Sequence, residues 1–348
     1  MPEHRRRVPG APPRKGRKQR IYADLSRAHD DVTLVVWQPD DRKRLDVLLV
    51  ERLPWRSRTQ VQGMIERGEV LVNGAPAHKA SQRVLHNDRL LVRVPKPEDA
   101  LRNEDVPLRA LYEDPKLLAL DKPAGVICHP VGNKRFGTLA NALHARYRND
   151  DPALDIVPRL CHRLDRETSG IILVALAPGV RKRMQWIFES KKVVKEYLAV
   201  VQGLYPVDYE IVDLPLGPRG GRIRIARGVD HEHGVPAQTV INVEQRFEPR
   251  PGDDGFTFIR ASPITGRQHQ IRVHALARGH PVLGDTMYGP EELGWKGFPA
   301  PPARPILARH ALHAHRIQFP HPVSGEELDI RAPLPPDMAE LLSFLRSR

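Results

Sequence analysis

Residues 162–170 read His-Arg-Leu-Asp-Arg-Glu-Thr-Ser-Gly and lead directly into the apolar run Ile-Ile-Leu-Val-Ala at residues 171–175. The apolar run predicts a buried strand. The polar stretch before it predicts a loop at the edge of a sheet, where functional side chains often lie. Taken alone, Asp165 between two arginines is most often part of a structural ion pair, and residues 168–170 can be a simple turn. The residue types by themselves leave both interpretations open.

Helical and strand patterns are mixed along the larger part of the chain. Val180, Met184, Ile187 and Phe188 recur at helical intervals, so residues 180–190 are expected to form a helix with one apolar face. Short apolar runs predict strands at residues 108–112, 116–120, 170–175, 197–201 and 256–260. No glycine-rich phosphate loop or dinucleotide fingerprint interrupts them. This order predicts an α+β domain over residues 107–348.

A smaller α/β unit is expected at residues 32–95. Residues 44–49 have helical spacing, Ser57 is a candidate N-cap of a second helix, and Gly68 is a candidate stop. Strands are expected at residues 32–36, 69–72 and 88–94, with a hairpin turn at Asn73-Gly74.

The segments around this unit have too few apolar residues to form a core. Residues 1–31 are expected to be a disordered basic tail, which either keeps the protein in solution or holds phosphates nonspecifically. A polar, proline-containing linker is expected at residues 96–106.

The net charge of +13 favours an anionic polymer as partner, because clustered Lys and Arg gain affinity by releasing counterions from phosphates. A membrane is disfavoured, since no apolar run reaches the roughly 20 residues that span a bilayer. The basic N-terminus lacks the apolar segment of a secretory signal, which predicts a cytoplasmic protein. Cys128 and Cys161 are expected to be reduced, buried residues, and His310, His313 and His315 match no common zinc spacing.

Residues 57–60 and 68–74 resemble the alpha-L RNA-binding domain found in the fourth small-subunit ribosomal protein and in tyrosyl-tRNA synthetases. That resemblance implies that the two helices of residues 32–95 present basic side chains to RNA. The matching basic positions are Arg44, Arg56, Arg58 and Arg67. An accessory domain with simply solvated arginines is the alternative interpretation.

Residues 162–170 match every fixed position of the signature loop of the RluA-type pseudouridine synthases. Further segments resemble motifs of the same family at residues 120–130, 137–143, 195–199, 265–274 and 279–289. The resemblance implies a catalytic domain with a mixed, mainly antiparallel sheet flanked by helices. It also implies an isomerase that detaches uracil from ribose and rejoins it through carbon.

The family resemblance makes Asp165 the essential carboxylate, which either attacks ribose C1′ or removes a proton from C2′. Both routes require an ionised carboxylate in a site that has expelled water, and burial opposes ionisation. Arg272 is the expected cationic partner of Asp165, with Arg267 as the second choice. The alternative role of Arg267 is a phosphate contact.

The resemblance also assigns residues to the substrate. Tyr197 is expected to stack on the uracil and to help remove its C5 proton, and Ile271 is expected on the other face of the base. Arg163 either fills the stack vacated by the flipped base or contacts a phosphate. His162, Arg44 and Arg58 complete the expected RNA contacts.

No cofactor or metal is expected, because the isomerisation is redox-neutral. The expected partner is RNA, in the form of large-subunit (23S-type) ribosomal RNA or a pre-ribosomal particle, and the protein is expected to act as a monomer. Transfer RNA is the alternative substrate. A non-catalytic ribosome-assembly factor is the alternative from another functional class.

Overall fold

The computed structural model describes residues 25, 31–53, 56–93, 106–131, 136–151, 153–220, 225–289 and 307–347. The chain divides into two compact units, residues 1–101 and 102–348. Apart from residues 25, 31 and 106, the predicted tail and linker lie outside the described residues.

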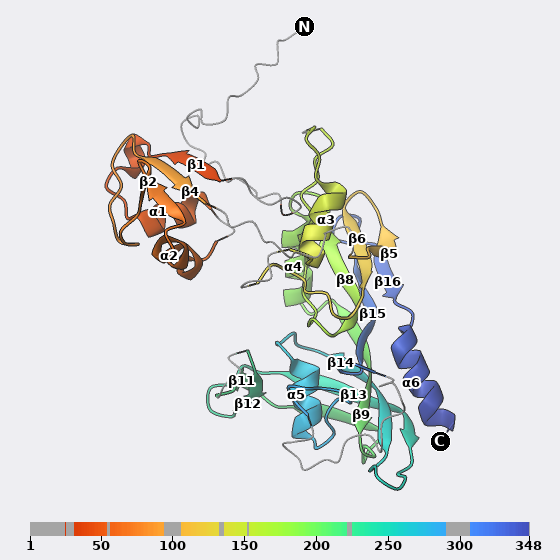
Figure 1. The fold of residues 1–348 in the computed structure, drawn as a ribbon. Helices are drawn as coiled ribbons and strands as arrows, with labels where there is room; N and C mark the ends of the chain where they lie inside the picture. The colour runs from red at the N-terminus through yellow and green to blue at the C-terminus, as the bar shows by residue number, and fades with distance from the viewer. Residues whose placement is uncertain are drawn as a thin grey trace. The chain divides into compact units, whose positions relative to one another are not determined.

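The first unit packs two helices against a small antiparallel sheet of order β1-β4-β2-β3 (Figure 1). Ser57 caps the second helix as expected, in a capping box with Gln60. Asn73 and Gly74 both have positive φ, of 52° and 87°, which suits the tight hairpin between β2 and β3. The elements are β1 (Val32–Val35), η1 (Gln38–Asp40), α1 (Leu45–Arg52), α2 (Arg58–Glu66), β2 (Val70–Val72), β3 (Ala75–Pro76) and β4 (Arg89–Val92).

The second unit is built on one large sheet, with the strand order β10-β13-β14-β9-β15-β8-β6-β5 and with β16 and β7 paired at its side. Among the described residues the strand pairs of this sheet are antiparallel, except that β15 runs parallel to β8. The predicted α+β fold with a mixed, mainly antiparallel sheet is therefore confirmed.

The strands of this unit are β5 (Arg109–Glu113), β6 (Leu117–Lys122), β7 (Arg159–Leu160), β8 (Ser169–Ala175), β9 (Val194–Gln202), β10 (Tyr209–Asp213), β13 (Gln238–Phe247), β14 (Phe256–Pro263), β15 (Leu312–Pro320) and β16 (Glu327–Arg331). A separate two-stranded antiparallel sheet pairs β11 (Leu216–Pro218) with β12 (Arg227–Val229). The helices are α3 (Leu139–Tyr147), α4 (Val180–Glu189), α5 (Gln270–Ala277) and α6 (Pro336–Ser347).

Both faces of the β6–β8 half of the sheet are covered. Leu120 and Ile172 belong to the core under α3, whereas their neighbours Ala119 and Ile171 belong to the core under α4. Alternate residues of a strand point to opposite faces, so a strand covered on both sides is apolar throughout. This explains why residues 170–175 form an uninterrupted apolar run.

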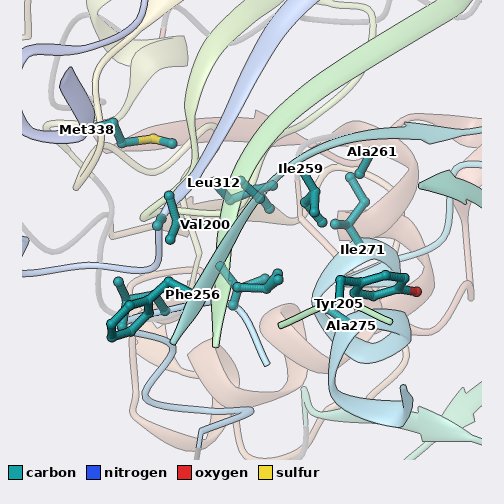
Figure 2. Packing of buried hydrophobic residues seen from close by; sticks show 14 of the residues in the cluster. Val200, Tyr205, Phe256, Ile259, Ala261, Ile271, Ala275, Leu312 and Met338 are labelled. Carbon is teal, nitrogen blue, oxygen red and sulfur yellow. The ribbon is translucent and has the colours of Figure 1, made fainter. Parts of the chain in front are cut away.

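The other half of the sheet carries α5 and α6. Ile271 and Ala275 of α5 lie close to Ile259 and Ala261 of β14 (Figure 2). Met338 of α6 belongs to the same apolar cluster. Because α5 is fixed to the sheet by Ile271, the neighbouring residue Arg272 has a fixed position as well.

Gly170 allows the parallel contact between β8 and β15, immediately after the polar loop. It has a φ of 110° and pairs with Ala314. A Cβ atom at this position would lie 2.2 Å from the Ala314 carbonyl oxygen. The glycine therefore sets how closely the two halves of the sheet approach at the loop.

We expect Gly170→Ala to lower the free energy of unfolding by more than Gly179→Ala does. Both glycines have positive φ, which costs a non-glycine residue about 1–3 kcal/mol, but a Cβ at Gly179 would meet nothing within 4 Å. Urea unfolding of the two variants separates the cost of the clash from that of the backbone conformation. Equal losses would contradict the proposed close approach.

Candidate active site

Asp165 lies in the loop between β7 and β8, and neighbouring segments hold this loop from two sides. The Lys122 ammonium donates to the carbonyls of Pro123, Val126 and Arg166 at 2.8–3.1 Å, although its side chain is fully buried. The Gly125 amide also donates to the Arg166 carbonyl, at 2.9 Å. The loop is thereby tied to the segment that follows β6.

The C-terminal side of the loop is tied to the segment that leads into β15. Thr168 Oγ1 lies 2.8 Å from His310 Nε2, and Ser169 Oγ lies 2.9 Å from His313 Nδ1. Arg309 donates to the Glu167 carbonyl at 3.2 Å. The backbone around Asp165 is therefore held by residues more than 140 positions away in the sequence.

Arg272 bridges two carboxylates. Its Nη1 donates to Asp165 Oδ2 at 2.9 Å, while Nε and Nη2 donate to the two oxygens of Asp285 at 2.6 and 2.8 Å. Asp285 in turn accepts from the backbone amides of Met287 and Tyr288. The structure thus brings the predicted pair Asp165–Arg272 together and adds Asp285 as the anchor of the arginine.

The charges of this trio are unevenly exposed. The Asp165 side chain is 20% exposed, that of Arg272 is 6% exposed, and that of Asp285 is fully buried. Burial acts to lower the pKa of Arg272, but the hydrogen bonds and charges of Asp285 and Asp165 outweigh it and raise the pKa. Burial acts to raise the pKa of Asp285, but Arg272 lowers it overall. Two carboxylates share one guanidinium, so the accessible Asp165 is only partly neutralised.

His269 approaches Asp165 from the start of α5, where its φ of 60° turns the chain. Its Nε2 lies 3.7 Å from Asp165 Oδ1, and its Nδ1 lies 2.7 Å from the Tyr288 hydroxyl. That hydroxyl already accepts from the Arg227 amide and is fully buried, so we assign its proton to His269 Nδ1. His269 then carries its own proton on Nε2, directed at Asp165.

A cavity of about 740 Å³ opens beside Asp165. A volume in this range suits a small ligand or a single flipped nucleotide. Its lining includes the predicted site residues His162, Arg163, Asp165, Tyr197, Arg267, Ile271 and Arg272.

Tyr197 and Ile271 supply apolar surface to the cavity. Tyr197 follows Lys195 and Glu196 on β9, and burial together with the charge of Asp165 raises the pKa of its phenol. Ile271 is a buried residue of α5. A neutral phenol and an aliphatic side chain near the carboxylate are suited to hold a planar base.

The other predicted residues of the cavity differ in how they are held. Arg163, two residues before Asp165, is exposed. Arg267 donates from Nε to the Pro236 carbonyl at 3.1 Å, so the structure gives Arg272 rather than Arg267 as the partner of Asp165. His162 Nε2 accepts from the Leu173 amide at 3.0 Å, and burial lowers its pKa to about 3. The Nε2 atom of His162 is therefore occupied by a hydrogen bond within the protein.

Arg44 and Arg58 belong to the first unit and converge on Asp46. Arg44 Nε donates to one oxygen of this fully buried carboxylate, and Arg58 Nε donates to the other, each at 3.0 Å. Gln62 donates to Asp46 as well, at 3.2 Å. Two guanidinium groups around one carboxylate leave a local net positive charge, and both arginines remain partly exposed.

Four residues around Asp165 were given no role by the sequence analysis. They are Lys122, Lys195, His269 and Asp285. Each lies inside a segment that carried the family resemblance, but residue type and spacing do not show which side chains meet. Lys195 lines the cavity, and burial lowers the pKa of its ammonium to about 8.

The three histidines at positions 310, 313 and 315 make hydrogen bonds within the protein. His310 and His313 make the hydrogen bonds described above, burial lowers the pKa of each to about 4, and His315 Nδ1 lies 2.8 Å from the Ala332 carbonyl oxygen. Among the described residues, no group of three or more His, Cys, Asp or Glu side chains could hold a metal ion. Both cysteines are free thiols.

Sequence comparison accounts for both units. Residues 116–277 match the RNA pseudouridylate synthase family, and residues 43–90 match the S4 domain. A relative from Nitrosomonas europaea, "Ribosomal large subunit pseudouridine synthase D", is 36% identical over 95% of this chain and 94% of its own length. The chain belongs to the RNA pseudouridylate synthase family. It is accordingly an isomerase that converts uridine in RNA to pseudouridine.

A second relative and a solved structure are also similar to this chain. The protein of the same name from Neisseria meningitidis is 34% identical over 93% of this chain and 84% of its own length. Human RNA Pseudouridylate Synthase Domain Containing 1 is similar in structure, with a TM-score of 0.51, 25% sequence identity, and coverage of 73% of this chain and 98% of that one. Within the described part of this family member, no helix is both long and apolar enough to cross a membrane.

Asp165→Asn and Asp285→Asn should have different effects. Asp165→Asn should abolish release of tritium from RNA labelled at uridine C5, yet change the free energy of unfolding by no more than about 1 kcal/mol, because Arg272 keeps Asp285. Asp285→Asn should lower that free energy by about 3–5 kcal/mol and tritium release by about 10- to 100-fold, because it removes the buried charge that anchors Arg272. Equal stability losses would contradict the anchoring role of Asp285.

RNA affinity should fall as pH rises from about 7 to 9, in part because Lys195 loses its proton. The Lys195 amine, with a pKa of about 8, is charged below that pH and neutral above it. Loss of one solvent-accessible ion pair lowers binding affinity by a factor of about 2 to 5. In Lys195→Gln the affinity should be lower at pH 7 and less dependent on pH. Filter binding across this range measures both proteins, with exposed Lys116→Gln as the control.

Lys122 also has a pKa near 8, but it is present in both proteins, so the difference between them isolates Lys195. An identical pH dependence in the native protein and Lys195→Gln would contradict a role for this charge.

Proposed function

We propose that this chain converts uridines of large-subunit ribosomal RNA to pseudouridines, with Asp165 as the essential carboxylate. The observation that carries the proposal is the partly exposed Asp165 carboxylate, held by buried Arg272 at the wall of a nucleotide-sized cavity. The ribosomal substrate is supported by the names of the relatives that align over nearly the whole chain, S4 domain included.

The reaction breaks the bond between N1 of uracil and C1′ of ribose and forms a bond between C5 and C1′. N1 takes up a proton, and C5 loses one. Asp165 acts either by attacking C1′ or by removing the C2′ proton, and both routes use the same partly neutralised carboxylate. Arg272 and the Nε2–H of His269 would hold its oxygens in place in either case.

Tyr197 and Ile271 would hold the uracil while it turns. The raised pKa of the Tyr197 phenol favours stacking over proton abstraction, since a neutral phenol is a poor base. Extraction of the base from stacked RNA costs about a few kcal/mol. Exposed Arg163, which lines the same cavity as Asp165, has the planar group needed to fill the vacated stack or to bind the adjacent phosphate.

The remaining contacts are assigned to RNA binding. Arg44 and Arg58 would present their outer guanidinium nitrogens to phosphates while Asp46 fixes their inner ones. Arg267 would contact a phosphate at the cavity. His162 would support the loop rather than touch RNA through its Nε2. Since Asp165, Arg272 and Asp285 come from one chain, we propose that a monomer is active.

Pseudouridine mapping in total RNA, in cells with and without the gene, tests the proposal. We expect specific sites in large-subunit ribosomal RNA to be lost and to return with the native gene but not with Asp165→Asn. Sites lost in transfer RNA would contradict the ribosomal substrate. Sites restored by Asp165→Asn would contradict the role of the carboxylate, and no lost sites would favour an assembly factor without catalysis.

A further inference from the structure

Helix α4 has an exposed aromatic residue on its outer face. Val180, Met184 and Ile187 are buried against the sheet, whereas Trp186 points away from it and is 56% exposed. Tryptophan is usually largely buried, because its indole gains more than most side chains from leaving water. An exposed indole on a well-packed helix contributes little to this fold, which suggests another use.

The surroundings of Trp186 are strongly basic. The exposed cations of α4 and of the turn after it are Arg181, Lys182, Arg183, Lys191 and Lys192. The nearby acid Glu189 accepts a hydrogen bond from Gln185 at 2.9 Å. Lys192 Nζ lies 4.8 Å from the centre of the Trp186 ring, a cation–π contact that places a positive charge at the indole. An anionic ligand with planar groups matches this surface better than an apolar protein segment does.

This basic face is continuous with the cavity of Asp165. Gln185, Phe188, Glu189 and Lys191 of the same segment line the cavity wall. Trp186 lies three residues before Glu189 on the same helix, and side chains at this spacing are neighbours, so the indole stands next to the rim. A strand of RNA with one nucleotide in the cavity would extend its neighbouring nucleotides over α4.

We propose that the outer face of α4 and the turn after it, formed by Trp186, Lys191 and Lys192, binds the single-stranded RNA that flanks the target uridine, with one base stacked on the Trp186 indole. Aromatic platforms interleaved with Lys and Arg hold single strands in this way, and stacking tolerates any base because every base has a flat face. The inference rests on the proposed function, since it identifies how the substrate of the same cavity is held.

The test compares Trp186→Ala, Trp186→Phe and a matched control, Tyr209→Ala, in the full chain. Tyr209 lies on β10 and is 58% exposed, but it does not line the cavity. The probes are a short oligouridylate and uridine monophosphate. We expect Trp186→Ala to raise the Kd for the oligouridylate about tenfold while binding of the monophosphate stays unchanged. Trp186→Phe should retain most of the affinity, and Tyr209→Ala should match the native protein.

Two results would overturn the inference. An oligouridylate Kd that is the same in Trp186→Ala and Tyr209→Ala would mean that RNA does not stack on this face, which would then be free for a protein partner. An equal loss of affinity for the monophosphate and the oligouridylate would mean that Trp186 only supports the fold of the cavity.

Tritium release keeps this inference separate from the proposed function. With ribosomal RNA labelled at uridine C5, Trp186→Ala should raise KM and leave kcat near its native value. A native chain that released no tritium would contradict the proposed function, whereas an active native chain with an unchanged KM in Trp186→Ala would contradict the stacking platform alone.

Discussion

The Arg272 guanidinium between Asp165 and Asp285 is the interaction on which the arrangement of the site depends. A buried guanidinium is stable only when its donors find acceptors of opposite charge, since the desolvation of an unpaired ion costs several kcal/mol. Arg272 comes from α5, Asp165 from the loop before β8, and Asp285 from the turn after α5. The ion network therefore forms only when the helix, the loop and the turn are placed correctly together.

Hydrogen bonds from neighbouring segments fix the loop that carries Asp165. Lys122 ties the loop to the end of β6, and His310 and His313 tie it to the strand beside it. Gly170 lets that strand come close enough for these short hydrogen bonds. Because buried hydrogen-bond networks are costly when only partly formed, such a loop has one preferred conformation. The carboxylate is thereby positioned before RNA arrives.

In the first unit, too, a buried carboxylate holds arginine side chains in place. Buried Asp46 holds Arg44, Arg58 and Gln62, so that two arginines which would otherwise be mobile have fixed inner nitrogens. Fixed cations lose less entropy on contact with phosphate than mobile ones do. In both units a fully buried carboxylate thus sets the position of an arginine.

Many of the local elements of this fold, and the family of the chain, could be predicted from the sequence alone. The apolar spacing of residues 170–175 and 180–190 identified β8 and α4, and Ser57 and Asn73-Gly74 identified a helix start and a hairpin, because these signals act over a few neighbouring residues. The loop at 162–170 identified the family, and the same resemblance predicts Asp165 as its carboxylate. Strand order was not accessible, since the parallel pairing of β8 with β15 joins residues more than 140 positions apart.

The roles of Asp285 and His269 were decided only by the tertiary structure. Their residue types are compatible with many sites, and nothing in their spacing indicates that one faces Arg272 and the other Asp165. Likewise, sequence left Arg267 and Arg272 as competing partners of the carboxylate, and the choice depended on the direction in which α5 packs on β14. A chain's sequence determines which local elements form and which groups are available for chemistry. Distance and burial, which decide how those groups act, arise only when remote segments pack together.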